Sequence, residues 1–514
     1  MLKATSLWSL LEARAEATPD APLAFNNRHE EISFGALRER ALRAAHGLAR
    51  IGVRPGQTVS WMLPTRIESL VLIAALARLG AIQNPILPIY RERELRFIAD
   101  QCRPTLLITP GLWRGFDYAE MAIEVASEYT DMRTLVVDAI LPESDAGGLP
   151  PTNVLTNTAE PDPIRWLFYT SGTTADPKGV RHSDTTLFAA ARGMSRAIDL
   201  RDSDRVAFVF PITHVGGLVW FQAALAHGCA LILIESFADP DTIQTLQKHG
   251  VTLAAAGTIF HEAYLAASRR SSSPPLFPDV RAFPGGGAPK PPQLHYDLRS
   301  EMGGVGILSG YGSTEAPILT MSCVDDPSDK LAQTEGRAAL PDVDIRILLD
   351  NDEQAAPGQN GEIRVRAPQL FHGYMDSRLD RAAFDAQGYF RTGDLGRLDA
   401  DGHLLVTGRM KDIIIRKGEN IPAGEVEDLL HEHPKVSEVA VIGLPDSRTG
   451  ERCCAVVTCP DATSPITFEE MKAYLIDRQL MIQRIPEQLE VVEALPHNAT
   501  GKISKQELRD HFGR

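Results

Sequence analysis

The chain has 514 residues, a length that predicts at least two domains, and its content of 44% hydrophobic and 23% charged residues is typical of a globular protein. Its 52 basic and 67 acidic side chains give a formal net charge of −15, which argues against nucleic acid or an anionic membrane as the main partner. The longest apolar runs are too short to span a bilayer, and the N-terminal segment lacks the apolar core of a signal peptide. The six cysteines show neither zinc nor redox spacing. We therefore expect a cytoplasmic protein without a stable membrane anchor.

Most of the chain alternates between the helical and the strand pattern. Predicted helices lie at 36–50, 67–79, 218–226, 242–249 and 259–267, and predicted strands at 59–63, 105–109, 205–210, 230–234, 252–256 and 280–283. This alternation predicts a layered α/β fold with parallel strands. The shorter β-like segments at 344–349 and 361–366 predict a small antiparallel unit, and the pattern after residue 408 predicts a small α+β domain.

The stretch from Tyr169 to Val180 reads Tyr-Thr-Ser-Gly-Thr-Thr-Ala-Asp-Pro-Lys-Gly-Val and follows a short apolar run that predicts a buried strand. Bare backbone N–H groups, hydroxyls and one ammonium are suited to surrounding phosphate oxygens. Ser183 and Asp184 then stand where the N-cap of a helix at 185–198 is expected. A solvated linker is the alternative, but linkers seldom place a lysine here between Asp-Pro and Gly. We predict a phosphate-binding loop, although the Walker pattern is absent.

Further motifs follow in a fixed order. They are Pro-Ile-Thr-His-Val-Gly-Gly at 211–217, Gly-Tyr-Gly-Ser-Thr-Glu at 310–315, Tyr-Phe-Arg-Thr-Gly-Asp at 389–394, Gly-Arg-Met-Lys-Asp at 408–412, Lys-Gly-Glu-Asn at 417–420 and Pro-His-Asn-Ala-Thr-Gly-Lys at 496–502. With the predicted loop, this set closely resembles the adenylate-forming superfamily of acyl- and aryl-CoA synthetases, peptide-synthetase adenylation domains and luciferases. The resemblance covers nearly the whole chain. The overall pattern is most similar to medium-chain and cyclohexanecarboxylate-type CoA ligases.

The resemblance implies a division of labour between two domains. Residues 1–408 would form the N-terminal core, with layered α/β subdomains and a small β unit, and 409–514 a mobile α+β domain carrying the catalytic lysine. The implied ATP-binding residues are Thr170, Ser171, Gly172, Thr173, Thr174 and Lys178 around the triphosphate, Gly287, Ala288, Gly310 and Tyr311 at adenine, and Asp394 and Arg409 at the ribose. Thr314 would contact the α-phosphate, Glu315 would hold Mg²⁺, and Lys502 would reach the α-phosphate and the substrate carboxylate. Lys411 would mark the hinge and Gly418 the CoA tunnel, while Ala175 replaces the glycine usual in the loop.

Taken singly, several of these residues have simpler explanations. Asp394 could cap a turn, Thr314-Glu315 could begin a helix, and Lys502 could be a solvated lysine beside a glycine turn. His214 alone would more often be a core or capping histidine; the resemblance gives it a gating or orienting role. The ordered set favours the functional interpretation of each one.

The segment 206–230 would line the acyl pocket, with His214, Gly216, Gly217 and Trp220 on it and Gly286 opposite. It contains no Asp, Glu, Lys or Arg, and an amino-acid substrate would need a buried acid for its ammonium group. We therefore predict a carboxylic acid–CoA ligase that uses ATP and Mg²⁺ on a neutral-tailed medium-chain, alicyclic or aryl acid, through acyl-AMP. Two alternatives stay open: an acyl-AMP ligase that loads a carrier protein, and a catalytically silent acyl-AMP-binding protein. A homodimer also stays open.

Overall fold

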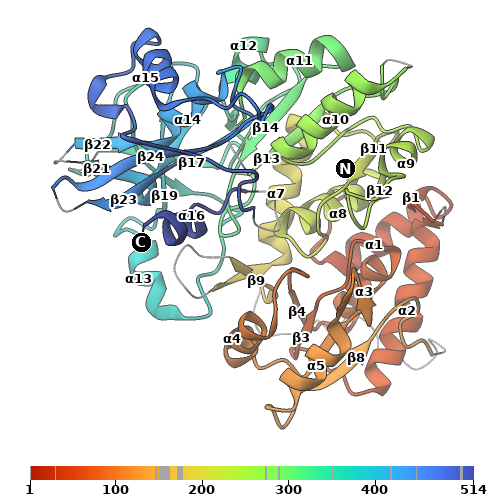
Figure 1. The fold of residues 1–514 in the computed structure, drawn as a ribbon. Helices are drawn as coiled ribbons and strands as arrows, with labels where there is room; N and C mark the ends of the chain where they lie inside the picture. The colour runs from red at the N-terminus through yellow and green to blue at the C-terminus, as the bar shows by residue number, and fades with distance from the viewer. Residues whose placement is uncertain are drawn as a thin grey trace.

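The computed structural model describes residues 2–28, 30–144, 149, 162–170, 177–272, 275–287, 290–349, 351–416, 419–446, 448–497 and 502–513. Across these ranges, no helix has the length and apolar character needed to cross a membrane. The helices are α1 (Leu7–Ala17), α2 (Phe34–Arg50), α3 (Ile67–Leu79), α4 (Glu92–Cys102), α5 (Tyr118–Ala126), α7 (Asp184–Ala197), α8 (Val215–His227), α9 (Thr242–Lys248), α10 (Thr258–Arg270), α11 (Pro292–Met302), α12 (Ser328–Gln333), α13 (Asp380–Ala383), α14 (Ala423–His431), α15 (Phe468–Asp477) and α16 (Lys505–Phe512) (Figure 1).

The first sheet has the strand order β10-β9-β4-β3-β5-β8. Its strands are β3 (Thr58–Trp61), β4 (Ile82–Pro85), β5 (Leu106–Thr109), β8 (Arg133–Val136), β9 (Ile164–Thr170) and β10 (Lys178–Ser183), and a hairpin of β6 (Leu112–Trp113) and β7 (Phe116–Asp117) follows β5. Neighbours pair in parallel except β10, which runs antiparallel to β9. The predicted parallel α/β arrangement is therefore confirmed.

Two further sheets complete the large part of the chain. One has the order β11-β12-β1-β2, with β1 (Pro22–Asn26), β2 (Glu31–Ser33), β11 (Arg205–Phe208) and β12 (Ala230–Leu233). The other has the order β13-β14-β15-β16, with β13 (Phe283–Gly286), β14 (Ile307–Tyr311), β15 (Thr320–Met321) and β16 (Arg337–Ala338). One apolar core contains side chains of α3 and α8 together with strand residues of the first two sheets, so these helices pack between the sheets.

One strand was not predicted, and one predicted strand is wrong. Residues 178–183, between the predicted loop and α7, form β10, whose Val180 and His182 are buried in the core. The strand predicted at 252–256 is wrong. Only Leu253 makes strand bridges, to Val206 and Ala282, because the N–H of Ala255 turns back to the carbonyl of Leu253 at 2.9 Å.

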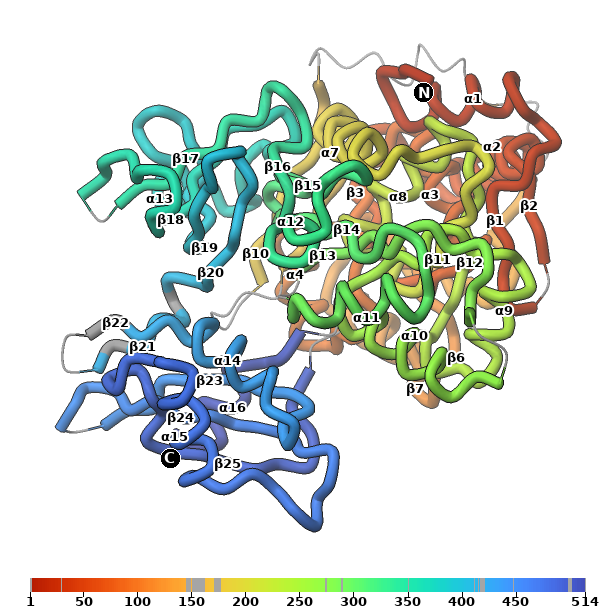
Figure 2. The backbone as a smooth tube through the Cα atoms, turned by 90° about the horizontal axis from the view of Figure 1, so that it is seen from above, coloured from red at the N-terminus to blue at the C-terminus, as the bar shows by residue number. Residues whose placement is uncertain are grey.

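The C-terminal half contains two antiparallel-rich units. The order β17-β18-β19-β20 forms a small antiparallel sheet from β17 (Asp344–Leu348), β18 (Gly361–Arg366), β19 (Phe390–Leu398) and β20 (Leu404–Arg409). After the short helix η2 (Met410–Asp412), the last sheet contains β21 (Ile413–Arg416), β22 (Glu419–Pro422), β23 (Glu438–Asp446), β24 (Gly450–Thr458) and β25 (Gln488–Val491). Figure 2 shows this last sheet and its helices, in blue, as a separate lobe beside the rest of the chain.

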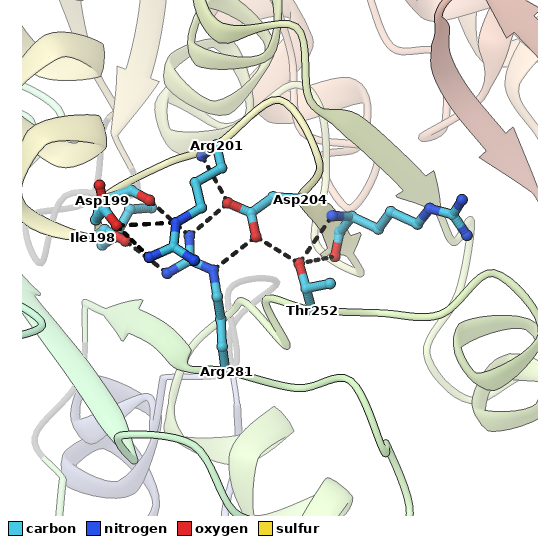
Figure 3. A network of polar contacts seen from close by, with 7 residues as sticks. Ile198, Asp199, Arg201, Asp204, Thr252 and Arg281 are labelled. Atoms are coloured by element: carbon cyan, nitrogen blue, oxygen red, sulfur yellow. Dashed lines mark hydrogen bonds and ion pairs between the residues drawn. The ribbon is translucent and has the colours of Figure 1, made fainter.

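A buried carboxylate joins three segments of the large domain (Figure 3). Asp204 is 2% exposed and accepts hydrogen bonds from Arg281 at both of its oxygens, at 2.7 and 2.5 Å. The hydroxyl of Thr252 and the backbone N–H of Arg201 also donate to it, each at 2.8 Å. Burial alone would raise the pKa of Asp204, but these hydrogen bonds outweigh burial and lower it. The carboxylate therefore stays ionised and fixes the start of β11 against the segment that leads into β13.

Candidate active site

The hairpin of β9 and β10 carries the lysine that the sequence predicts to bind phosphate. Lys178, the first residue of β10, stands opposite Thr170, the last residue of β9. Its ammonium lies 5.5 Å from the centre of the Tyr374 ring, within the range of a cation–π interaction. The predicted loop residues Ser171, Gly172, Thr173 and Thr174 lie outside the described residues. Strand pairing thus holds Lys178 and Thr170 on either side of that loop.

The turn after β14 carries Thr314. Its carbonyl oxygen lies 2.8 Å from Nε2 of His182, a buried residue of β10. Because a carbonyl only accepts, Nε2 is the donor, and Thr186 lies 2.9 Å from the other ring nitrogen. Burial lowers the pKa of His182 to about 4, so the ring is neutral at pH 7. The motif with Thr314 is therefore tied directly to the strand that carries Lys178.

Glu315, the next residue of the turn, is the predicted Mg²⁺ ligand. Its Oε1 accepts a hydrogen bond of 2.9 Å from the hydroxyl of Tyr374, and its carbonyl accepts one of 2.9 Å from the N–H of Phe371. Within the described part of the chain no donor reaches Oε2. A carboxylate with one oxygen held and the other available fits the oxygen ligand that Mg²⁺ prefers.

Tyr311, Asp394 and Arg409 come together although they lie far apart in the sequence. The hydroxyl of Tyr311, the last residue of β14, donates to Oδ2 of Asp394 at 2.7 Å. Nε of Arg409 lies 3.0 Å from Oδ1 of Asp394, because these two residues face each other in the β19–β20 ladder. Burial, and then the charge of Asp394, raises the pKa of Tyr311, so the phenol stays protonated at neutral pH. The residues predicted for adenine and for ribose thus form one connected group.

The ends of β13 and β14 beside Tyr311 carry glycines and therefore no side chains. Gly286 pairs with Gly310 across β13 and β14, and a Cβ on Gly286 would lie 2.2 Å from the carbonyl oxygen of Gly310. Gly287 has a φ of +85°, a conformation that favours glycine. Ala288 lies outside the described residues. No side chain fits on Gly286 without moving backbone, and the bare strand ends suit the close approach of a ligand.

The C-terminal lobe brings Lys502 to the same place. Its Nζ lies 3.9 Å, and its Cε 3.7 Å, from the position that a Cβ on Gly287 would occupy. Burial, and then the charge of Lys502, lowers the pKa of His214 to about 4. The His214 ring and the Lys502 ammonium therefore share one region at the strand ends of the large domain, and the ring is neutral at pH 7.

His214 is also the N-cap of α8. Its Nδ1 accepts a hydrogen bond of 3.1 Å from the backbone N–H of Gly216. The capping interpretation of this histidine is confirmed, and it is compatible with a place in the site. Because Nδ1 accepts, the neutral ring carries its proton on Nε2.

The pKa of His214 tests the position of Lys502 in solution. The Lys502→Ala variant lacks a positive charge that disfavours the imidazolium, so we expect the pKa of His214 to rise from about 4 while staying below 6.5, because the ring remains buried. An NMR titration measures it, with the ring assigned by comparison with a His214→Asn variant. The control is Lys505→Ala, which removes a lysine that pairs with Glu427. Equal His214 pKa values in both variants would place Lys502 away from the histidine.

The residues predicted for the acyl pocket fall into two groups. His214 borders a small pocket, and Gly216 adjoins its ring. Gly217 instead packs on the backbone of Ile212, where a Cβ would lie 2.6 Å from the carbonyl oxygen, and Trp220 is 6% exposed within the apolar core. Gly286 lies at the strand pair described above. The described residues that line this pocket are Pro85, Ile86, Leu87, Tyr90, Phe168, Tyr169, Thr213, His214, Val215 and Thr314, and none of them is charged.

Some residues of the site were not found from the sequence. His182 and Tyr374 hold Thr314 and Glu315 through hydrogen bonds. Pro85, Ile86, Leu87 and Tyr90 border the pocket. The apolar run at 85–87, at the carboxyl end of β4, was the available signal for the pocket wall, because ligands bind at the carboxyl ends of parallel strands. Of the predicted hinge and tunnel residues, Lys411 belongs to η2, between β20 and the last sheet, and Gly418 lies outside the described residues.

Comparisons with known proteins agree with this geometry. Residues 11–375 match the family model of the AMP-binding enzyme, and residues 425–502 match that of the AMP-binding enzyme C-terminal domain. The chain is 29% identical to the medium-chain fatty-acid–CoA ligase of Escherichia coli, across 99% of this chain and 91% of that protein. It is 31% identical to the salicyl-AMP ligase / salicyl-S-ArCP synthetase of Mycobacterium tuberculosis, across 94% of this chain and 86% of that protein.

Among solved structures, ATP-bound MatB from Rhodopseudomonas palustris superposes with a TM-score of 0.87 at 27% identity, covering 98% of this chain and 99% of that chain. Apo MatB gives a TM-score of 0.76 at 26% identity, with 99% of both chains covered. The arrangement described above is thus more similar to the ATP-bound structure than to the apo structure. The chain belongs to the AMP-binding enzyme family.

Proposed function

We propose that this AMP-binding enzyme is an ATP-dependent carboxylic acid–CoA ligase for a neutral-tailed medium-chain, alicyclic or aryl acid. The acid is first joined to AMP with release of pyrophosphate, and the acyl group then passes to the thiol of CoA with release of AMP. The observation that carries the proposal is the meeting of Lys502, from the C-terminal lobe, with His214 and Gly287 at the strand ends of the large domain.

The first half-reaction brings two anions together. A carboxylate oxygen attacks the α-phosphorus of ATP, and the bond from that phosphorus to the oxygen bridging to the β-phosphorus breaks. The acid is already ionised at neutral pH, so no general base is needed. Positive charge must instead offset the repulsion, and Lys502 and Lys178 supply it from two sides of the site. Their contribution is positioning and charge stabilisation, the main sources of catalysis in phosphoryl chemistry.

Glu315 is the residue that would hold Mg²⁺. Its Oε1 is fixed by the hydroxyl of Tyr374, and its other oxygen has no donor among the described residues. When bound, the ion neutralises charge on the phosphate oxygens of ATP. Asp394 and Arg409 would hold the ribose hydroxyls, and the ring of Tyr311 would stack on adenine.

The second half-reaction needs a thiolate at the acyl carbon, a position that Lys502 would crowd if it contacts the substrate carboxylate as proposed. We propose that residues 409–514 rotate about Lys411 as one mobile domain. The rotation withdraws Lys502, and Gly418 then lines the path of the CoA thiol. His214, neutral at pH 7 and fixed at its N-cap, would orient the acyl group during both steps.

The uncharged pocket supports the proposed substrate class. An ammonium or a second carboxylate on the acid would be buried among apolar and neutral groups at high cost. A cytosolic location is part of the same proposal. All six cysteines are free thiols, which suits a reducing compartment.

A panel of carboxylic acids tests the function. With ATP and Mg²⁺, an acid of the proposed class should drive exchange of labelled pyrophosphate into ATP, and CoA should then yield AMP and the thioester. Amino acids, dicarboxylates and a reaction without acid are the controls. If no acid in a broad panel supports exchange, the protein is the catalytically silent alternative and the proposal fails.

The same assay separates CoA from a carrier protein as acceptor. The likeness to a salicyl-AMP ligase / salicyl-S-ArCP synthetase supports keeping the carrier as the second candidate. Thioester formed on a phosphopantetheinylated carrier, but not on free CoA, would overturn the proposed acceptor while leaving the acyl-AMP step intact.

A further inference from the structure

The segment 371–375 connects the strand of the predicted phosphate loop to the turn with Glu315. Its backbone pairs with β10 through three hydrogen bonds: His372 N–H to Arg181 O at 2.8 Å, Arg181 N–H to Gly373 O at 3.2 Å, and Met375 N–H to Gly179 O at 2.8 Å. At its start, the N–H of Phe371 donates to the carbonyl of Glu315. One short segment therefore fixes two parts of the site that lie more than a hundred residues apart in the chain.

Tyr374 is the side chain of this segment that touches both parts. It is 4% exposed, and its hydroxyl donates to Oε1 of Glu315 at 2.9 Å. The ammonium of Lys178 lies over its ring, 5.5 Å from the centroid. The ring of Phe371, with centroids 4.8 Å apart, packs beside it and fixes its plane.

The chemistry of the phenol suits a fixed donor. A tyrosine hydroxyl carries its proton at neutral pH and therefore donates to an ionised carboxylate. A donor on one carboxylate oxygen stops the carboxylate from turning and leaves the other oxygen in a defined direction. A ring beneath the ammonium limits the directions in which a flexible lysine side chain can point.

We propose that Tyr374 is a positioning residue that orients Glu315 toward a divalent cation and Lys178 toward the phosphates of ATP. This inference rests on the proposed function, since it assigns Tyr374 to the same nucleotide site. Tyr374 itself contacts neither substrate nor metal. Its effect passes through the two side chains that it holds, so its loss should weaken the linkage between Mg²⁺ and ATP binding rather than abolish the fold.

Calorimetric titration of the full-length protein with ATP, in excess Mg²⁺ and in excess EDTA, tests this linkage without any turnover. In the wild-type protein, Mg²⁺ should tighten ATP binding. In Tyr374→Phe, which keeps the ring but removes the donor to a charged group, we expect that gain to shrink by about tenfold. ATP binding in EDTA should stay unchanged. Tyr374→Leu, which also removes the ring beneath Lys178, should weaken ATP binding in EDTA as well.

Tyr389→Phe is the matched control. Tyr389 is 1% exposed, and its hydroxyl donates to the carboxylate of Asp344 on β17, so the change also removes a tyrosine–carboxylate hydrogen bond. In Tyr389→Phe, Mg²⁺ should tighten ATP binding as much as it does in the wild-type protein. If Tyr374→Phe behaves like Tyr389→Phe, Tyr374 is only a packing residue and the inference is wrong, while the proposed function stands. If the wild-type protein binds no ATP, the proposed function itself fails.

Discussion

Replacing Lys502 with alanine should slow the formation of acyl-AMP by at least about 100-fold, because the site loses a positive charge that acts where negative charge develops. The second half-reaction, started from supplied acyl-AMP and CoA, should change far less, since the proposed rotation withdraws the lysine before the thiol attacks. Pyrophosphate exchange measures the first step, and thioester formation from the isolated adenylate measures the second.

The Lys505→Ala variant is the control for that experiment. Lys505 belongs to the same C-terminal lobe and pairs with Glu427 at 2.7 Å, so its loss changes the charge of the lobe without removing a group at the site. Both half-reactions should then proceed as in the wild type. Equal losses of both steps in Lys502→Ala would contradict the scheme of two orientations.

Replacing Asp204 with alanine should lower the free energy of unfolding by about 3–5 kcal/mol, because the partly buried guanidinium of Arg281 loses its carboxylate partner. Arg281 donates to both oxygens of Asp204, and no other carboxylate of the described chain pairs with Arg281. Because the folded pKa of Asp204 is lowered, its ionised form stabilises the protein above the unfolded pKa. The contribution is lost as the pH falls through the folded pKa. Urea unfolding at neutral pH measures the difference.

The Asp297→Ala variant provides the comparison. Asp297 pairs with Arg269 at 2.8 Å on the surface of α11, and Arg269 keeps a second partner in Glu301. An exposed pair of this kind contributes about 1 kcal/mol or less. If Asp204→Ala lowers the free energy of unfolding by no more than Asp297→Ala does, the network around Asp204 does not stabilise the fold as proposed.

Local patterns predicted most elements of the large domain well. The helix expected at 67–79 is α3 with the same ends, because its apolar residues are continuous and Gly80 ends it in the left-handed conformation. Ser183 caps α7 as expected. β10 was missed because its short sequence does not alternate between apolar and polar residues: it contains Gly179 and the partly exposed Lys178 and Arg181. Its pairing with β9 and with 371–375 stabilises it, and those contacts are not local.

The motifs indicated the family and the chemistry, and the comparisons confirmed the family. The motifs did not indicate the residues that hold the predicted site residues in place. His182 and Tyr374 act through Thr314 and Glu315, which lie more than fifty residues away along the chain, and single polar residues of this kind have no spacing signal. The pocket wall was predicted along 206–230, and Thr213, His214 and Val215 of that segment border the pocket, whereas Gly217 packs on Ile212 and Trp220 lies in the apolar core. A helix buried on all faces does not reveal from its sequence which face borders a ligand.

The sequence by itself determined the residue types of the chemistry: the hydroxyl- and glycine-rich loop with its lysine, the acid after Thr314, the Tyr311–Asp394–Arg409 set and the lysine near the C-terminus. The loop follows from what phosphate oxygens require of a chain, and the roles of the other residues are those that the resemblance to the adenylate-forming superfamily implies. Only the tertiary structure decided that Lys502 lies beside His214 and Gly287, and that Tyr374 joins Glu315 to Lys178. The physical reason is that both contacts depend on how separately folded units are placed against each other, and packing between units leaves no periodic pattern in the sequence.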